Sequence, residues 1–183
     1  MTVVLASKSP RRQEILKFAG IPFTVRASDV PEVPEEGESP EMYVKRLAVA
    51  KAHAVARTSR EIILAADTTV VVDDHILEKP ADPDDASRML RKLSGREHQV
   101  HTGVCLLGQD REIVDVATTV VRFSELSMVE VGDYVRSGEP MDKAGGYGIQ
   151  GLAAKFVESI DGCYFNVMGL PISLVYRHLK SFQ

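Results

Sequence analysis

The sequence predicts an α/β protein with a mixed β-sheet, and three observations lead to this class. Short apolar, β-branched segments alternate with segments of helical spacing along the 183 residues. Residues 61–74, "EIILAADTTVVVDD", form a β-branched run typical of a buried strand. Residues 98–108 and 112–123 read as two long strands joined by "QDR", which predicts a hairpin and hence antiparallel pairing in the sheet.

The first part of the chain predicts two strands and two helices around an acidic loop. "TVVLA" and "IPFTVRAS" are strand-like, and the first of these is followed by a helix that ends at Gly20. The proline-rich and acidic segment after the second strand has no basic residue and predicts a loop. In order, we expect a strand at 2–6, a helix at 10–19, a strand at 21–28, a loop at 29–41 and an Ala/Val-rich helix at 43–57.

The remaining elements are marked by turns and caps. "DDHILEKP" predicts that the chain turns back after the long strand, and Gly95 is placed to end the next helix. In order, we expect a turn at 73–80, a helix at 82–95, the hairpin, a helix at 127–138, a glycine-dense segment at 142–151, a strand at 154–162 and a final helix that starts near 169–171.

Composition narrows the class of protein. The net charge of −4 argues against a large non-specific nucleic-acid surface, and no apolar run approaches the ~20 residues of a membrane helix. The N-terminal segment lacks the pattern of a signal peptide. Cys105 and Cys163 are too few for a disulfide framework. We therefore expect a single cytoplasmic domain over residues 1–183, with reduced thiols, no membrane and no nucleic-acid polymer as partner.

The helix that follows "LASKSP" begins with two cations. Ser9-Pro10, Ser39-Pro40 and Asp82-Pro83 each predict an N-cap followed by Pro at the first helical position. The second and third helices continue with acids, whereas the first continues with Arg11 and Arg12, which should cost roughly 0.3–1 kcal/mol against the helix dipole. A bound phosphate would reverse that preference. The alternative is that both arginines extend into solvent.

Asp67 interrupts the apolar strand at 61–74. A carboxylate in a buried strand is costly unless a cation, a metal or hydrogen-bond donors meet it. Asp67 is therefore a candidate metal ligand or general base that activates water, with Thr68 and Thr69 adding hydroxyls. The alternative is a harmless acid at a strand end or bulge.

Two further segments could contact a nucleotide. Lys79 follows the turn after the long strand, where it could meet a phosphate or simply lie on the surface. The segment "DKAGGYGIQG" has four glycines, which allow close approach of a ligand, and Gln150 offers an amide suited to a base edge. The P-loop and dinucleotide fingerprints are absent, and the five histidines have no metal-site spacing.

Six motifs occur together in order: "LASKSPRRQEIL", "AADTTV", "LEKP", "LSGREHQVHTGV", "DKAGGYGIQG" and "NVMGLP". This combination resembles the Maf family of nucleoside triphosphate pyrophosphatases and covers essentially the whole chain. The resemblance implies a fold like that of the inosine-triphosphatase relatives, with an elongated mixed sheet, flanking helices and two lobes with a cleft. It implies hydrolysis of a nucleoside triphosphate to the monophosphate and pyrophosphate, with a divalent metal (Mg²⁺ or Mn²⁺), as house-cleaning of the nucleotide pool.

The resemblance also assigns roles to residues. It places the catalytic proton acceptor on Asp67, and "SPRR" and "EKP" place triphosphate contacts on Arg11, Arg12 and Lys79. The remaining implied contacts are Ser7 and Lys51 for the substrate, and Glu32 together with Asp67 for the metal.

Within the family, the sequence resembles the branch that acts on dTTP and UTP. That branch is marked at the positions of Arg11, Thr68 and Gln150. Modified pyrimidine nucleotides are further expected substrates, and the preference among these nucleotides stays open. The resemblance further implies a homodimer.

Two other functions are compatible with parts of the sequence. A haloacid-dehalogenase-like phosphatase also has an Asp at a strand end, but it requires a second Asp two positions on, where this chain has Thr69. The second alternative is a nucleotide-binding regulator of cell division without significant turnover.

Overall fold

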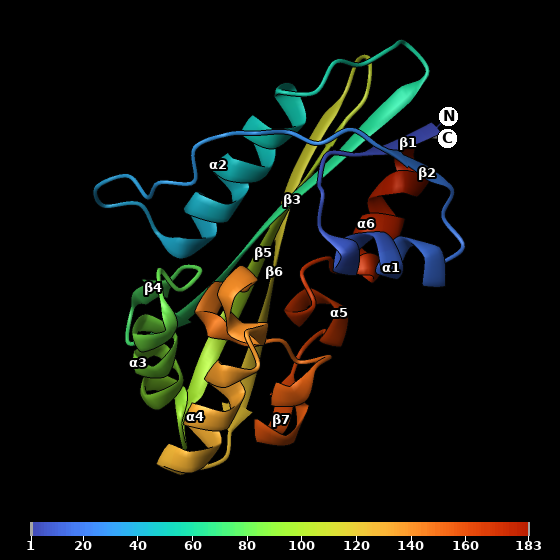
Figure 1. The fold of residues 1–183 in the computed structure, drawn as a ribbon. Coiled ribbons are helices and arrows are strands. Elements are labelled where there is room, and N and C mark those ends of the chain that lie inside the picture. Colours follow the sequence, from blue (N-terminus) through green and yellow to red (C-terminus); the bar gives the residue numbers. More distant parts are fainter. Residues whose placement is uncertain (1, 183) are drawn as a thin grey trace. The chain divides into compact units, whose positions relative to one another are not determined.

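A computed structural model describes residues 2–182, and Figure 1 shows its strands and helices. Strands lie at β1 Thr2–Leu5, β2 Phe23–Val25, β3 Glu61–Val72, β4 His75–Leu77, β5 Glu97–Leu107, β6 Glu112–Phe123 and β7 Val157–Asp161. Helices lie at α1 Pro10–Phe18, α2 Pro40–His53, α3 Pro83–Leu93, α4 Met128–Arg136, α5 Tyr164–Val167 and α6 Ile172–Leu179. Short 3-10 helices lie at η1 Glu139–Asp142, η2 Ala144–Gly146, η3 Leu152–Phe156 and η4 Lys180–Phe182.

The sheet is mixed, as predicted. Its strand order is β2-β1-β3-β5-β6-β7, with β4 paired to β3 off this path. β1 pairs in parallel with both β2 and β3, whereas β4 pairs antiparallel with β3 and β7 with β6. The expected hairpin is present, because β5 and β6 are consecutive neighbours joined by a turn in which Gly108 N–H donates to the Arg111 carbonyl (2.8 Å).

The described chain divides into two compact units. The first contains residues 2–68, 102–117 and 169–182, and the second contains residues 69–101 and 118–168. Strands β3, β5 and β6 each contribute residues to both units. Two expectations stay predictions: the cleft that the resemblance implies, and a single domain over residues 1–183.

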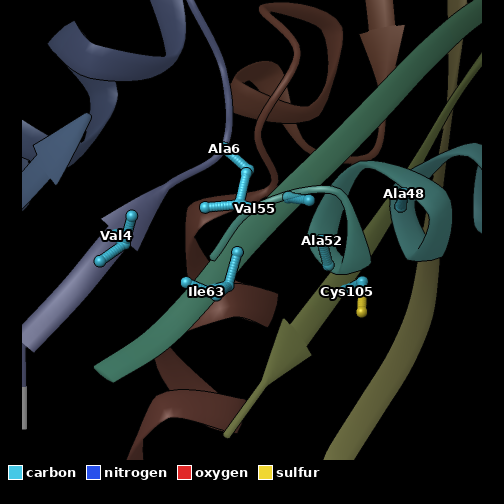
Figure 2. Packing of buried hydrophobic residues seen from close by; sticks show 8 residues of the cluster. Val4, Ala6, Ala48, Ala52, Val55, Ile63 and Cys105 are labelled. Atoms are coloured by element: carbon cyan, nitrogen blue, oxygen red, sulfur yellow. The ribbon is translucent and has the colours of Figure 1, made fainter. Parts of the chain in front are cut away.

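In the first unit, α2 packs closely on the strands through small residues. Ala48 and Ala52 of α2 are fully buried and join a cluster with Ile63 of β3 and Cys105 of β5 (Figure 2). At Gly103 of β5 an added Cβ would lie 2.4 Å from the Val44 carbonyl oxygen of α2. The helix backbone therefore lies against the strand, and this contact fixes which residues of α2 face β3.

The second unit has an aromatic core. Phe123 of β6 contacts His98 edge-on (centroids 5.0 Å) and Tyr147 (4.7 Å). Such edge-to-face pairs are favourable beyond their apolar burial. In this core the His98 ring shares a hydrogen bond between Nε2 and the Tyr147 hydroxyl (2.7 Å).

Three predicted boundaries were wrong. The helix expected at 43–57 is α2, which begins at Pro40 because the Ser39 side chain accepts from Met42 N–H, and which ends at His53. The strand expected at 154–162 starts only at Val157, after η3. The strand expected at 21–28 is confined to β2, whereas the final helix begins at Ile172, close to its predicted start. No helix within residues 2–182 is long and apolar enough to cross a membrane.

Candidate active site

Asp67 lies inside β3, where a lysine bridges it to a second acid. Lys51 of α2 donates from Nζ to Asp67 Oδ1 and to Glu32 Oε1, both at 2.5 Å. Asp67 is 6% exposed and Lys51 is 8% exposed. The costly buried carboxylate thus meets a cation, and its position within the strand argues against the harmless strand-end alternative.

Glu32 reaches this pair because its loop is held on α2 at several points. Arg46 of α2 donates to both oxygens of Glu38 (2.7 and 2.6 Å) and to the Val33 carbonyl (2.9 Å). At the other end, the Ser28 hydroxyl donates to the Ala6 carbonyl beyond β1 (3.2 Å). The prediction of a loop was right. Glu32, which the resemblance assigns to the metal, lies at the candidate site beside Lys51 and Asp67.

Arg12 points from the start of α1 into a set of oxygen acceptors. It donates from Nε to the Gly169 carbonyl (2.8 Å), from Nη1 to Ser7 Oγ (3.2 Å) and from Nη2 to Thr68 Oγ1 (3.2 Å). The guanidinium has five N–H groups, so each terminal nitrogen keeps one further donor. Solvent extension is therefore wrong for Arg12, whereas Arg11 is half-buried next to it.

The "NVMGLP" motif supplies one of these acceptors. Gly169 adopts a φ of +107°, and an added Cβ there would lie 3.4 Å from Thr68 Oγ1 and 3.6 Å from Arg12 Nε. The glycine turns its carbonyl toward Arg12 without a side chain in between. Thr102 of β5, fully buried, completes the set through a hydrogen bond between its hydroxyl and that of Thr68 (2.9 Å). Sequence reasoning assigned no role to either residue.

The predicted capping by Ser9 was wrong. Ser39 and Asp82 accept from Met42 N–H (3.3 Å) and Asp85 N–H (2.8 Å), but the Ser9 side chain makes no capping bond. Ser9 contributes its backbone N–H to Ser7 Oγ instead (3.2 Å). The first turn of α1 thus lacks both a side-chain cap and an acid, which are present at the other two helix starts.

Charge and burial shift the pKa values at this site in informative directions. Burial raises the pKa of Asp67, and the nearby charges of Lys51 and Arg12 oppose that shift. Desolvation lowers the pKa of the Arg12 guanidinium, while the negative charge of Asp67 raises it. A carboxylate whose pKa is raised is a stronger base than an exposed one, as a proton acceptor requires.

Lys79 and Gln150 belong to the second unit, and both are exposed. The expected turn after β3 is present, with Asp73 and Asp74 at positive φ, and β4 returns beside β3 just before Lys79. In the glycine-dense segment, a Cβ at Gly145 would lie 2.8 Å from the Val70 side chain. Gly145 is thus needed for packing against Val70, and the substrate contacts of Lys79 and Gln150 stay predictions.

Comparison with known proteins places the chain among well-defined relatives. Residues 2–182 match the family described as Maf-like protein. The dTTP/UTP pyrophosphatase of Koribacter versatilis is 53% identical over 181 residues, which cover 98% of this chain and 94% of that protein. The dTTP/UTP pyrophosphatase of Clostridium perfringens (strain 13) is 47% identical over 189 residues, covering 100% of this chain and 98% of that protein.

Solved structures support the fold independently. The Ham1 protein of Staphylococcus aureus has a TM-score of 0.56 at 16% identity, with all of both chains covered. A HAM1 protein from Coxiella burnetii has a TM-score of 0.53 at 17% identity, with 99% of this chain and 100% of that chain covered. At these identities the likeness is one of fold, and it agrees with the mixed α/β architecture expected above. Because the family match covers residues 2–182 and curated relatives are about half identical along the whole chain, this chain belongs to the Maf-like protein family.

Proposed function

We propose that this protein hydrolyses dTTP and UTP to the nucleoside monophosphate and pyrophosphate. The observation that carries the proposal is the cluster of Asp67, Lys51, Glu32 and Arg12, which joins a buried base to cations. Two relatives that match nearly the whole chain are named for this activity. House-cleaning of modified pyrimidine nucleotides, a cytoplasmic location and a homodimer belong to the same proposal.

Asp67 acts on the attacking water. Its carboxylate accepts a proton from that water as the oxygen attacks the α-phosphorus, and the bond from this phosphorus to the bridging oxygen of the β-phosphate breaks. Burial raises the pKa of Asp67, and Lys51 and Arg12 oppose this shift because each favours the charged form. The proton held by Asp67 is then released to solvent.

The cations of the chain balance the charge of the triphosphate. Arg12 is fixed by Ser7 and Thr68 so that its remaining donors are aimed before substrate arrives. Donors set in place before the reaction stabilise developing charge without reorganisation. We assign Arg11 and Lys79 to the same triphosphate and Gln150 to the base.

Asp67 and Glu32 would hold the divalent metal. Both direct a carboxylate oxygen at the Lys51 ammonium, so the pair already converges on a cation. No group of three His, Cys, Asp or Glu side chains suited to a metal occurs within residues 2–182. Two carboxylates fit Mg²⁺, which takes one or two such ligands and completes its shell with water and substrate phosphates. When bound, the metal supplies positive charge to the phosphate oxygens.

A nucleotide panel with identified products tests the proposal. Purified protein with Mg²⁺ is incubated separately with dTTP, UTP, CTP, GTP and ATP, and free phosphate is measured before and after added inorganic pyrophosphatase. We expect phosphate only after that enzyme is added, together with stoichiometric monophosphate, and fastest with dTTP and UTP. Stepwise release of orthophosphate would instead indicate a phosphatase, and nucleotide binding without any product would indicate a regulator.

A further inference from the structure

Both ends of segment 148–152 are hydrogen-bonded to one pair of side chains in the second unit. Tyr134 of α4 accepts from Gly148 N–H (3.2 Å) and donates from its hydroxyl to Glu139 Oε1 (2.9 Å). The two carboxylate oxygens of Glu139 both accept from Leu152 N–H, at 3.1 and 3.0 Å. The Tyr134 hydroxyl and the Glu139 carboxylate, which are hydrogen-bonded to each other, therefore hold the two ends of the segment that contains Gln150.

Tyr134 is built into the core and stays a donor. It is 2% exposed, and its ring packs edge-on against Phe156 (centroids 5.5 Å, 87°). Burial and, after it, the hydrogen bond to Glu139 raise the pKa of Tyr134, so its hydroxyl stays protonated. The rigid ring leaves the hydroxyl little freedom, and the position of Gly148 N–H is fixed accordingly.

Two glycines in the segment lie against side chains that follow α4. At Gly151 an added Cβ would lie 2.2 Å from Glu139 Oε1 and 2.5 Å from its carboxylate carbon. At Gly148 it would lie 2.7 Å from Cε of Lys143, which donates from Nζ to the Glu139 carbonyl (2.6 Å). Gly151 thus lies against the Glu139 carboxylate and Gly148 against the Lys143 side chain, so a Cβ at either position would require these side chains to shift.

Gln150 and Leu152 are the exposed side chains of this segment, and Gln150 is the polar one, while the neighbouring Ile149 is 8% exposed. We propose that Tyr134 and Glu139 are positioning residues that hold Gln150 for recognition of a pyrimidine base. This inference rests on the proposed function. It adds two residues that act through Gln150 and do not themselves contact the base. An amide distinguishes base edges only if its donor and acceptor are fixed, since a mobile amide can pair with several edges.

The positioning is tested first without any nucleotide, by amide hydrogen exchange in the Tyr134→Phe and Glu139→Ala variants. We expect exchange of the Gly148 amide to rise roughly tenfold in Tyr134→Phe, and of the Leu152 amide to rise similarly in Glu139→Ala, since each loses its acceptor. Tyr176→Phe is the matched control, because Tyr176 is 54% exposed on α6. Unchanged exchange at both amides would overturn the positioning role.

The consequence for recognition is tested by the ratio of kcat/KM for dTTP to that for GTP. A loss of folded enzyme lowers both rates equally and cancels in this ratio. Tyr134→Phe should lower the ratio on the order of tenfold, as misplacement of a recognition group does. In a Gln150→Ala background the same change should have no further effect, because the pair acts through Gln150.

The outcomes separate the two proposals. If Gln150→Ala lowers the ratio and Tyr134→Phe does not, the positioning inference is overturned and the base-reading role of Gln150 stands. If Gln150→Ala leaves the ratio unchanged, that role is overturned, and the exchange rates decide whether the pair fixes the segment. A further loss from Tyr134→Phe in the Gln150→Ala background also contradicts positioning through Gln150.

Discussion

At the scale of single residues, the chemistry depends on side chains held by partners rather than on isolated charges. Asp67 shows this most clearly, since its burial alone would favour the neutral acid, and Lys51 and Arg12 oppose that effect. Arg12 is in turn oriented by Ser7, Thr68 and the Gly169 carbonyl. Both arginines at the start of α1 are thus half-buried, and these three acceptors fix the orientation of Arg12.

Replacement of Asp67 by Asn separates proton transfer from binding. Asn keeps the size of the side chain but cannot accept the proton of the attacking water, so kcat for dTTP should fall by about 10²–10⁴-fold. The Kd for dTTP, measured by calorimetry, should change little, because the phosphate-binding cations remain. Asp110→Asn, an exposed Asp on the turn after β5, is the matched control and should keep full activity. Turnover by Asp67→Asn at the wild-type rate would exclude the assigned role.

At the scale of elements, the site depends on how α2 lies on the sheet. Lys51 meets Asp67 where α2 lies closely on the strands, since at Gly103 no side chain separates the helix backbone from β5. Small residues on the inner face of α2, Ala48 and Ala52, permit the same approach. The distance between helix and strand is therefore part of the construction of the site.

A methyl group at Gly103 should disturb this packing. In Gly103→Ala, Cβ would lie 2.4 Å from the Val44 carbonyl oxygen, so α2 or β5 must shift. We expect a loss of about 1–3 kcal/mol in the free energy of unfolding, measured in urea, which is typical of overpacking. The same substitution at Gly132 of α4 is the control, since its Cβ would approach only Arg136 Nη1 at 3.2 Å. Gly132→Ala should leave stability unchanged or raise it by up to about 1 kcal/mol. Equal stabilities for the two variants would contradict this account of the packing.

Elements with strong local signals could be predicted, and those set by packing could not. The helix α3 has its cap, its acidic first turn and Gly95 in the sequence, and the β5–β6 hairpin has two long strands around a short turn. By contrast, nothing local marks Gly103 as the contact with α2. The four-residue helix α5 was not predicted either, since no side-chain cap marks its start.

The candidate site shows the same division. Asp67 stood out because a charge in an apolar strand is unusual, and Arg12 stood out against two acidic helix starts. Their convergence with Lys51 and Glu32 depends on the register of α2 and on a loop held by Arg46, and these are tertiary properties. The roles of Thr102 and the Gly169 carbonyl were missed, because a buried hydroxyl and a backbone oxygen leave no distinctive sequence signal.

At the scale of the whole molecule, stability should depend on pH through the buried imidazole of His98. His98 is 3% exposed in the aromatic core of the second unit. Burial lowers the pKa of its ring from 6.5 to about 4 in the folded protein. Between these two values the unfolded chain binds a proton that the folded protein does not, so stability is full above pH 6.5 and is lost as pH falls toward 4.

The size of this effect can be measured against a variant that does not titrate at this position. From the two pKa values, a drop from pH 7.5 to pH 5 should cost about 2 kcal/mol of the free energy of unfolding through His98 alone. Urea unfolding of the wild type and of His98→Gln at both pH values isolates the contribution of His98 titration. Any effect of the substitution on the free energy of unfolding that does not depend on pH cancels in the difference between the two pH values. NMR should also show the His98 ring neutral at pH 5 in the folded protein. Two results would contradict this account: an equal loss of free energy of unfolding in the two proteins between pH 7.5 and pH 5, or a His98 ring that is already protonated at pH 5. In either case the core of the second unit tolerates a charged imidazole, and the burial of His98 does not determine the acid stability of the protein.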